Sequence, residues 1–298
     1  MQTEQIRAVR SFNRAVTQRI GALNDSFLDR GRPLGEARLL YEIGRAGREL
    51  HVLRQRLALD SGYLSRLLRS LERQGLVRTR RGSGDRRSRF VEPTPEGLGE
   101  LDEYDRRSDG FAQSLLRPLT VDQRGRLVAA MAEVERLMQA AAVAIRVEPP
   151  DSAAAAGCLE QYYTELSRRF DSGYDPAVTL PARPDELTPP AGCFLVAFLD
   201  GVPIGCGALK AKEGGVGEIK RMWVSRSARG FGVGRRLLQA LEDEARRFGL
   251  HTVRLETNKA LTEAQTLYRT AGYREVAPFN DEPYAHYWFE KTGLTGSS

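Results

Sequence analysis

The sequence predicts two domains, a mainly helical domain that carries a basic β-hairpin and a mixed α/β domain that follows it. The chain has 298 residues, of which 41% are hydrophobic, and that is enough to bury more than one core. Two consecutive prolines, Pro149 and Pro150, end a long helix-like run, because proline lacks the amide proton that a helix needs. We therefore expect the first domain at residues 1–145, a linker at 146–152 and the second domain at 153–298.

The net positive charge of the chain comes entirely from the first domain. Residues 1–145 contain 26 Arg, no Lys and 19 Asp or Glu, which gives +7, whereas the remaining residues contain 19 Lys or Arg and 20 Asp or Glu, which gives −1. An excess of this kind favours a polyanionic partner for the first domain.

The composition argues against several classes of protein. No stretch approaches the roughly 18 to 20 apolar residues of a membrane span, and the N-terminus lacks the apolar region of a signal peptide. The three cysteines and the three histidines are not spaced like metal ligands. We expect a protein of the reducing cytoplasm, with no membrane contact, no disulfide framework and no metal.

In the first domain, long helices are expected at residues 4–28 and 120–145, with a helix–turn–helix between them. The segment "YLSRLLRSLERQGLV" would be capped by Asp60 or Ser61 and closed by Gly75. Its leucines recur at i, i+3, i+4 and i+7, which predicts one buried stripe: Leu64, Leu67, Leu68 and Leu71. The opposite face is polar and basic.

A basic β-hairpin is predicted directly after this helix. In "LVRTRRGSGDRRSRFVEPTPEG" two strand-like arms flank a glycine-rich turn, and six arginines lie within residues 78–89. A helix–turn–helix followed by such a hairpin is the winged-helix arrangement, in which one element enters the major groove of DNA and the other follows phosphates or the minor groove.

Residues 1–145 resemble the MarR family of transcription factors. The resemblance rests on Asp85-Arg86-Arg87 in the wing, on "TPEG" after it and on the long terminal helices. It implies a homodimer formed by the terminal helices on a pseudo-palindromic operator in double-stranded DNA. The residues expected to contact DNA are Ser61, Tyr63, Ser65, Arg66 and Arg69 on the helix and Arg81, Arg86 and Arg87 on the wing. Two alternatives remain: the arginines only solubilise the surface, or the winged helix binds a protein.

The second domain has the pattern of a mixed sheet with helices. An amphipathic helix at "CLEQYYTELSRRF" precedes a hairpin around Asp200-Gly201 and the strand "EIKRMWV". A glycine loop, a helix, the strand "HTVRLETN", the helix "ALTEAQTLYRTAGY" and two final strands follow. Strand–loop–helix order of this kind favours a nucleotide-type ligand at the helix N-terminus.

The glycine loop, "RGFGVGRR" at residues 229–236, narrows the identity of that ligand. It lacks the Lys-Ser/Thr of a Walker loop and has GxGxG where a dinucleotide fingerprint has GxGxxG. The remaining pattern is R-x-x-G-x-G, in which glycines let the backbone approach a pyrophosphate. Amides at the start of the helix and the neighbouring Arg229 and Arg235 would then bind it.

With this loop, "RLETN" and "TLYRTAGY", residues 153–291 resemble the GNAT superfamily of N-acetyltransferases. The resemblance implies that acetyl-CoA is the cosubstrate and that an amine attacks its thioester directly, without metal. It further implies Tyr268 as the acid and Glu218 as the base. The residues implied in binding the coenzyme are Met222, Trp223, Val224, Arg229, Gly230, Phe231, Gly232, Val233, Gly234, Arg235, Asn258 and Tyr268.

The acceptor amine is expected beside the last loop, and it could belong to a small molecule or to a protein lysine. The candidate residues there are Asn280, Asp281, Glu282 and Tyr284. The hypothesis that combines both halves is a bifunctional transcriptional regulator and acetyltransferase. The alternative is a DNA-binding regulator whose second domain senses acetyl-CoA or CoA without turning it over.

Overall fold

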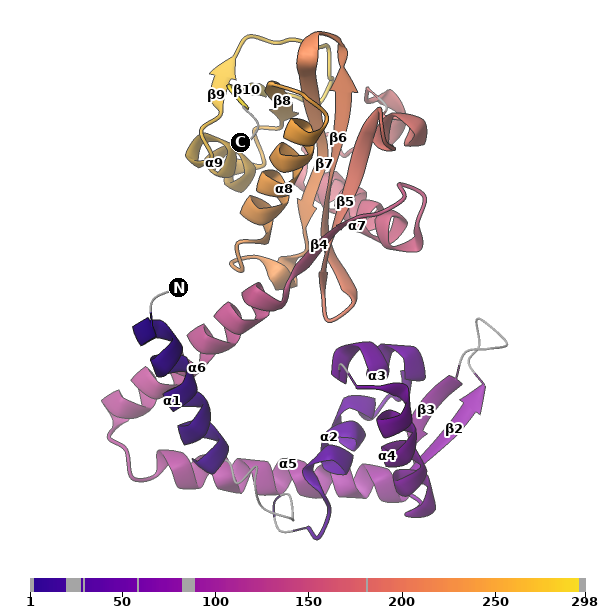
Figure 1. Cartoon of the computed structure of the whole chain (residues 1–298), viewed down its shortest axis with the longest axis vertical. Helices are drawn as coiled ribbons and strands as arrows, with labels where there is room; N and C mark the ends of the chain where they lie inside the picture. Colours follow the sequence, from indigo (N-terminus) through magenta and orange to yellow (C-terminus); the bar gives the residue numbers. More distant parts are fainter. Residues whose placement is uncertain are drawn as a thin grey trace. The chain divides into compact units, whose positions relative to one another are not determined.

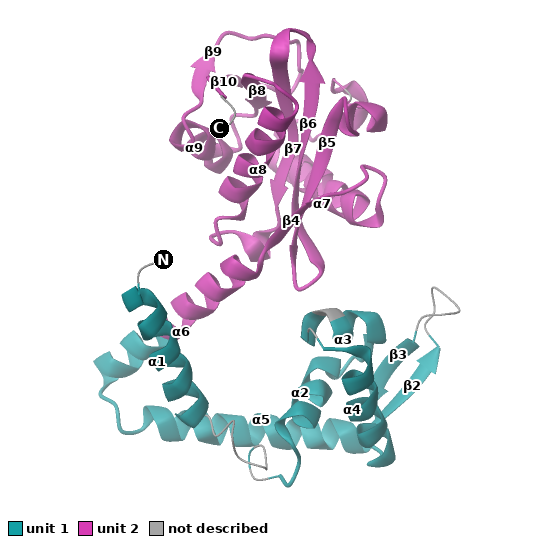
Figure 2. Cartoon of the chain, in the orientation of Figure 1, with its two compact units in different colours: residues 1–128 teal, residues 129–298 magenta. Residues whose placement is uncertain are grey.

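The computed structural model describes residues 3–19, 28, 30–57, 59–81, 89–180 and 182–294. The chain divides into two compact units, residues 1–128 and 129–298 (Figure 2), and each is described by itself. Within the described residues no helix is long and apolar enough to cross a membrane.

The first unit is a helical domain with a small sheet (Figure 1). Its elements are α1 (Thr3–Arg19), α2 (Leu34–Ile43), β1 (Arg48–Glu49), α3 (Leu50–Leu57), α4 (Ser61–Arg73), β2 (Val77–Arg81), β3 (Arg89–Pro93) and α5 (Pro95–Leu116), and α6 (Val121–Ala142) starts in it. The sheet has the order β1-β3-β2 and is antiparallel. The predicted helix–turn–helix and wing are thus confirmed, and the β1 strand was not predicted.

Local contacts fix the hairpin against helix α4. Asp60 caps the helix, because its carboxylate accepts a hydrogen bond of 2.9 Å from the Tyr63 amide. Thr94, after the hairpin, caps α5 through the Gly97 amide and donates a 2.6 Å hydrogen bond to the carbonyl of Gly75, at the end of α4. The leucine stripe of α4 is buried as expected. The polar face of α4 is therefore held at one fixed place beside the wing.

The two terminal helices carry apolar side chains that this single chain leaves uncovered. Helix α1 has no buried residue, and the same holds for α6. The described part of the first helix ends at Arg19, and α6 ends at Ala142, three residues before the expected end. The exposed apolar side chains are Ile6, Val9, Phe12 and Val16 on α1 and Val121, Val128, Met131, Leu137 and Met138 on α6.

The second unit is a sheet of order β4-β5-β6-β7-β8-β10-β9 with helices on both faces (Figure 1). The strands are β4 (Ala144–Val147), β5 (Gly192–Leu199), β6 (Val202–Lys212), β7 (Val216–Val224), β8 (Thr252–Thr257), β9 (Arg274–Val276) and β10 (Tyr287–Thr292). The helices are α7 (Ala153–Arg169), α8 (Val233–Arg247) and α9 (Thr262–Thr270), with short 3-10 turns at Pro176–Val178, Pro184–Leu187, Glu213–Gly215 and Arg226–Ala228. The predicted mixed α/β fold is confirmed.

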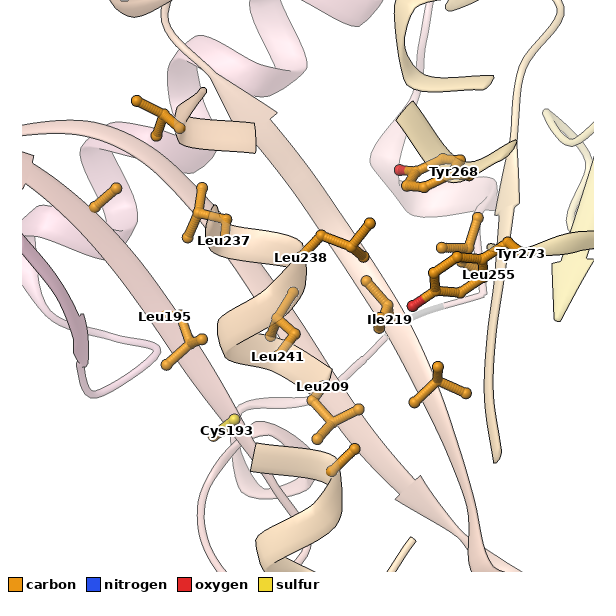
Figure 3. Close-up of a cluster of buried hydrophobic side chains, with 14 of the residues drawn as sticks. Cys193, Leu195, Leu209, Ile219, Leu237, Leu238, Leu241, Leu255, Tyr268 and Tyr273 are labelled. Atoms are coloured by element: carbon orange, nitrogen blue, oxygen red, sulfur yellow. The ribbon is translucent and has the colours of Figure 1, made fainter. Parts of the chain in front are cut away.

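Alternation along the strands separates two cores. In β5, Leu195 faces the core under α8, and its neighbours Phe194 and Val196 face the core under α7. Figure 3 shows the first of these cores, where Leu237 and Leu241 of α8 pack toward the sheet. The three cysteines are free and buried, so they act as small apolar residues.

The linker expected at residues 146–152 begins inside the sheet. Residues 144–147 form β4, which pairs with Leu195–Phe198 of β5. The helical run already ends at Ala142, and the unpredicted strand β4 lies between it and Pro149, so the prolines do not end the helix. Strand pairing depends on the partner strand, which lies far away in the sequence.

Candidate active site and nucleic-acid interface

The central feature of the second unit is the point where two parallel strands separate. β7 and β8 pair only at Val216↔Thr252, Gly217↔Val253 and Glu218↔Arg254. Beyond Glu218, β7 continues to Val224 without pairing to β8. Two cavities, of about 490 and 170 Å³, are lined by this unpaired part of β7 and by α7 and α9.

The glycine loop forms one end of the larger cavity. Gly230 has a φ of 86° and Gly232, the N-cap residue directly before α8, has a φ of 71°, values that favour glycine. No side chain caps α8, and its first regular hydrogen bond runs from the Arg236 amide to the Gly232 carbonyl. The amides of residues 233–235 are therefore open at a helix N-terminus, which is a binding arrangement for phosphate groups.

Arg229 is held in an ion-pair network that anchors the loop to α7. Its guanidinium donates to both carboxylate oxygens of Glu165, at 2.6 and 2.7 Å, and to the carbonyl of Val224. Glu165 also accepts from the indole of Trp223 at 3.0 Å and from Arg169. Burial favours a higher pKa for Glu165, but the hydrogen bonds from Arg229 and Trp223 outweigh it and lower its pKa. A contact between Arg229 and a bound ligand stays a prediction.

Tyr268 lies where the two cavities meet. It comes from α9, its side chain is buried, and it lines both cavities together with Met222. Its burial, helped by the charge of Glu256, raises the pKa of its hydroxyl. The hydroxyl therefore keeps its proton across the physiological range.

The carboxylates that line the smaller cavity do not include Glu218, the residue predicted to be the base. Glu218 is the last residue of β7 that pairs with β8, and its carboxylate lies 3.6 Å from the ammonium group of Lys212. It is not among the described residues that line either cavity. Glu256 of β8 and Glu282 line the smaller cavity. Glu256 forms an ion pair with Lys220, so it is fixed beside Tyr268. The role of Glu218 as a base stays a prediction, and sequence reasoning missed Glu256 because it lies in an ordinary strand.

The predicted acceptor loop does reach the smaller cavity. Glu282 and Tyr284 line it, whereas Asp281 is exposed and Asn280 accepts a 2.8 Å hydrogen bond from Trp288. Asn258 also lines this cavity rather than the larger one, and its amide donates to the carbonyl of Tyr284 at 2.8 Å. Asn258 thus holds the loop that contains Glu282 and Tyr284 in place.

The other predicted coenzyme contacts gather at the larger cavity. Trp223, Val224, Val233, Gly234 and Arg235 line it. Phe231 packs instead against the core under α8, so only its backbone belongs to the loop. No cluster of metal-ligating side chains occurs in the part of the chain that the structure describes.

In the first unit, the exposed face of α4 carries every residue predicted to enter a groove. Those residues are Ser61, Tyr63, Ser65, Arg66 and Arg69. The guanidinium of Arg66 lies 5.6 Å from the Tyr63 ring centroid. Arg81 is exposed at the end of β2, and Arg86 and Arg87 lie outside the described residues.

Not every arginine of the wing is available to a ligand. Arg78 and Arg80 both bind Glu92 of β3, at 2.8 and 3.1 Å, and their hydrogen bonds lower the pKa of that carboxylate. Arg80 also lies over the ring of Phe90, 4.3 Å from its centroid. These two arginines support the hairpin, whereas Arg66 and Arg69 on the exposed face of α4 form no ion pair within the described residues.

Comparison with known proteins finds one family match within each unit. Residues 159–273 match the acetyltransferase (GNAT) family, and residues 30–88 match the MarR family. Both resemblances expected from the sequence are thereby confirmed.

Two curated relatives each match about a third of the chain. An IAA acetyltransferase of Azospirillum brasilense is 48% identical over 92 residues, which are 30% of this chain and 59% of that protein. YsnE of Bacillus subtilis (strain 168), named as an uncharacterized N-acetyltransferase, is 34% identical over 99 residues, which are 33% of this chain and 66% of that protein. The chain thus spans less than two thirds of the length of these relatives.

Among solved structures, a GNAT-family acetyltransferase from Staphylococcus aureus Mu50 is 17% identical, with a TM-score of 0.44. The match covers 51% of this chain and 99% of that one.

Proposed function

We propose that this chain, which joins a MarR-family segment to a GNAT-family domain, binds acetyl-CoA and transfers its acetyl group to an amine. The observation that carries the proposal is the open, glycine-lined N-terminus of α8 at the end of a cavity of about 490 Å³. Such a terminus suits the diphosphate of the coenzyme, and the cavity extends from there to Tyr268.

The residues at the junction of the cavities match the needs of acetyl transfer. Acetyl-CoA would supply an activated thioester, so no covalent enzyme intermediate is required. As the amine nitrogen bonds to the acetyl carbon and the carbon–sulfur bond breaks, the amine loses a proton and the sulfur gains one. In this proposal Tyr268 gives the proton to sulfur, and Glu256 or Glu282, which also line the smaller cavity, receives the other.

The name of the Azospirillum brasilense relative supplies one acceptor to test. IAA therefore belongs in the first panel of candidates, beside small amines and lysine peptides. Release of CoA thiol from acetyl-CoA over this panel tests the transferase proposal directly.

Gly232→Ala is expected to weaken CoA binding about 5- to 30-fold. A non-glycine residue in left-handed backbone costs roughly 1–2 kcal/mol, so the loop relaxes in the free protein and must be restored on binding. Calorimetric titration with CoA measures the effect. Gly249→Ala is the matched control, because Gly249 has a φ of 72°, open space around its Cβ position and no place in either cavity. Equal CoA affinity in both variants would argue against the loop as the diphosphate site.

For the first unit we propose binding to an operator in double-stranded DNA by a homodimer. The exposed basic face of α4 supports the first part, and the uncovered apolar side chains of α1 and α6 support the second. A dimer would bring two such faces to the two half-sites of a pseudo-palindrome.

Arg66→Ala and Arg69→Ala are each expected to cost roughly 1–3 kcal/mol of affinity for the preferred operator if each reads a base. The operator is first selected from a random duplex library, and affinities are then measured at moderate salt. Arg126→Ala removes the same charge from the exposed surface of α6 and serves as control. Operator affinity that is the same for all three variants would exclude α4 as the reading helix.

A further inference from the structure

One part of the wall of the smaller cavity is aromatic, and aliphatic, polar and charged side chains line the rest. Five aromatic side chains from α7, the segment that follows it and the loop before β10 line it: Tyr162, Tyr163, Phe170, Tyr174 and Tyr284. Neighbouring ring centroids lie 5.0–5.9 Å apart. Burial raises the pKa of Tyr174 to about 12, so this tyrosine is uncharged at neutral pH. A wall of this kind favours a flat, apolar group.

The charged side chains that line the same cavity are not all paired with one another. Lys220 and Glu256 neutralise one another. Glu282 accepts a 3.0 Å hydrogen bond from the Leu180 amide. Arg221 donates one 2.9 Å hydrogen bond to the carbonyl of Ala182. Within the described residues no carboxylate lies within 4.0 Å of the Arg221 guanidinium, so this cation retains donors for a ligand.

A distortion of β7 brings Arg221 to this cavity. The register of β6 and β7 shifts between Cys206↔Trp223 and Ala208↔Lys220, so Arg221 and Met222 occupy a bulge. Arg221 has a φ of 57°, a backbone conformation that costs a non-glycine residue roughly 1–3 kcal/mol. Regular alternation would place Lys220 and Arg221 on opposite faces of the sheet, but both line the cavity. The strained backbone therefore serves to present a second cation there.

We propose that the acceptor is a small aromatic amino carboxylate, whose carboxylate is bound by Arg221 and whose ring lies against the aromatic wall. A guanidinium fork matches a carboxylate with two parallel hydrogen bonds. The amine would then lie toward the carboxylates of the cavity and toward Tyr268, where the larger cavity begins. The reaction of this ligand rests on the proposed acetyl transfer, whereas its binding does not.

The test is a binding series with the full chain saturated with CoA. Calorimetry compares L-phenylalanine, L-tyrosine and L-tryptophan with their amides, which keep the ring and the amine but lose the carboxylate, and with L-serine, which lacks the ring. At least one aromatic amino acid is expected to bind about tenfold more tightly than both its amide and serine. If none does, the proposal is overturned.

Variants at Arg221 identify the group that reads the carboxylate. Asparagine tolerates left-handed backbone but carries no charge, so Arg221→Asn should abolish the preference for the acid over the amide. Arg221→Lys keeps the charge and should retain part of this preference. Arg168→Gln, on the exposed surface of α7, is the control and should change nothing. An undiminished preference in folded Arg221→Asn would overturn the assignment of this residue.

Thiol release separates this inference from the proposed transfer. Preferential binding of the aromatic acid without thiol release would refute acetyl transfer to it and leave the binding site standing. Equal release with amines that lack a carboxylate would overturn the inference and leave the transferase standing.

Discussion

Tyr268→Phe is expected to lower kcat for acetyl transfer about 100-fold, because a well-placed proton donor contributes about 10²–10⁴ to a rate. CoA affinity should stay unchanged, since the phenylalanine ring keeps the packing against Tyr273 and Phe289, whose centroids lie 6.0 and 5.8 Å away. Thiol release under saturating acetyl-CoA and acceptor gives kcat, and calorimetry gives the affinity for CoA.

Tyr273→Phe is the matched control for this substitution. Tyr273 belongs to the same buried cluster (Figure 3) but lines neither cavity in the described structure, and its hydroxyl is buried without a hydrogen-bond partner there. Its loss should leave kcat intact. An unreduced kcat in Tyr268→Phe would remove tyrosine from the mechanism. CoA binding without thiol release in the wild type would favour the rival hypothesis of a domain that only senses the coenzyme.

The elements that could be predicted from the sequence are those with a local signal. The leucine stripe of α4 and the glycine loop before α8 each lie within a few consecutive residues, so periodicity and turn chemistry reveal them. The loop also carries the expected geometry, with Gly230 and Gly232 at positive φ. The predicted glycine turn of the wing lies outside the described residues. The position of Tyr268 followed from a family resemblance, and the structure places it at the meeting of two cavities.

The contacts that could not be predicted from the sequence join residues that lie far apart along the chain. Glu165 and Arg229 are separated by 64 residues, and β4 pairs with a strand about 50 residues further on. Lys220 and Glu256 meet across the separating strands over 36 residues. No local pattern distinguishes such residues from solvated charges or loop residues, because the partner alone decides their role.

Glu165→Gln is expected to lower the free energy of unfolding of the second unit by about 2 kcal/mol at neutral pH, because it leaves the Arg229 and Arg169 guanidiniums less well paired. The folded-state pKa of Glu165 is lowered. Its stabilisation is therefore fully present above the ordinary pKa of a glutamate and is lost as the pH falls through the folded-state value. The difference between wild type and variant should stay constant near neutrality and shrink in acid. Denaturant unfolding across this pH range measures it.

The same substitution also tests how the glycine loop is held. With Arg229 released from α7, ordering the loop on binding costs roughly 1 kcal/mol more, and CoA affinity should fall about fivefold. Glu160→Gln, an exposed carboxylate of the same helix, should alter neither stability nor affinity. Tighter CoA binding in Glu165→Gln would mean the opposite arrangement, in which Glu165 withholds Arg229 from the diphosphate. In that case the ion pair competes with the ligand, and the loop is positioned by its own backbone and by the packing of Phe231 against the core.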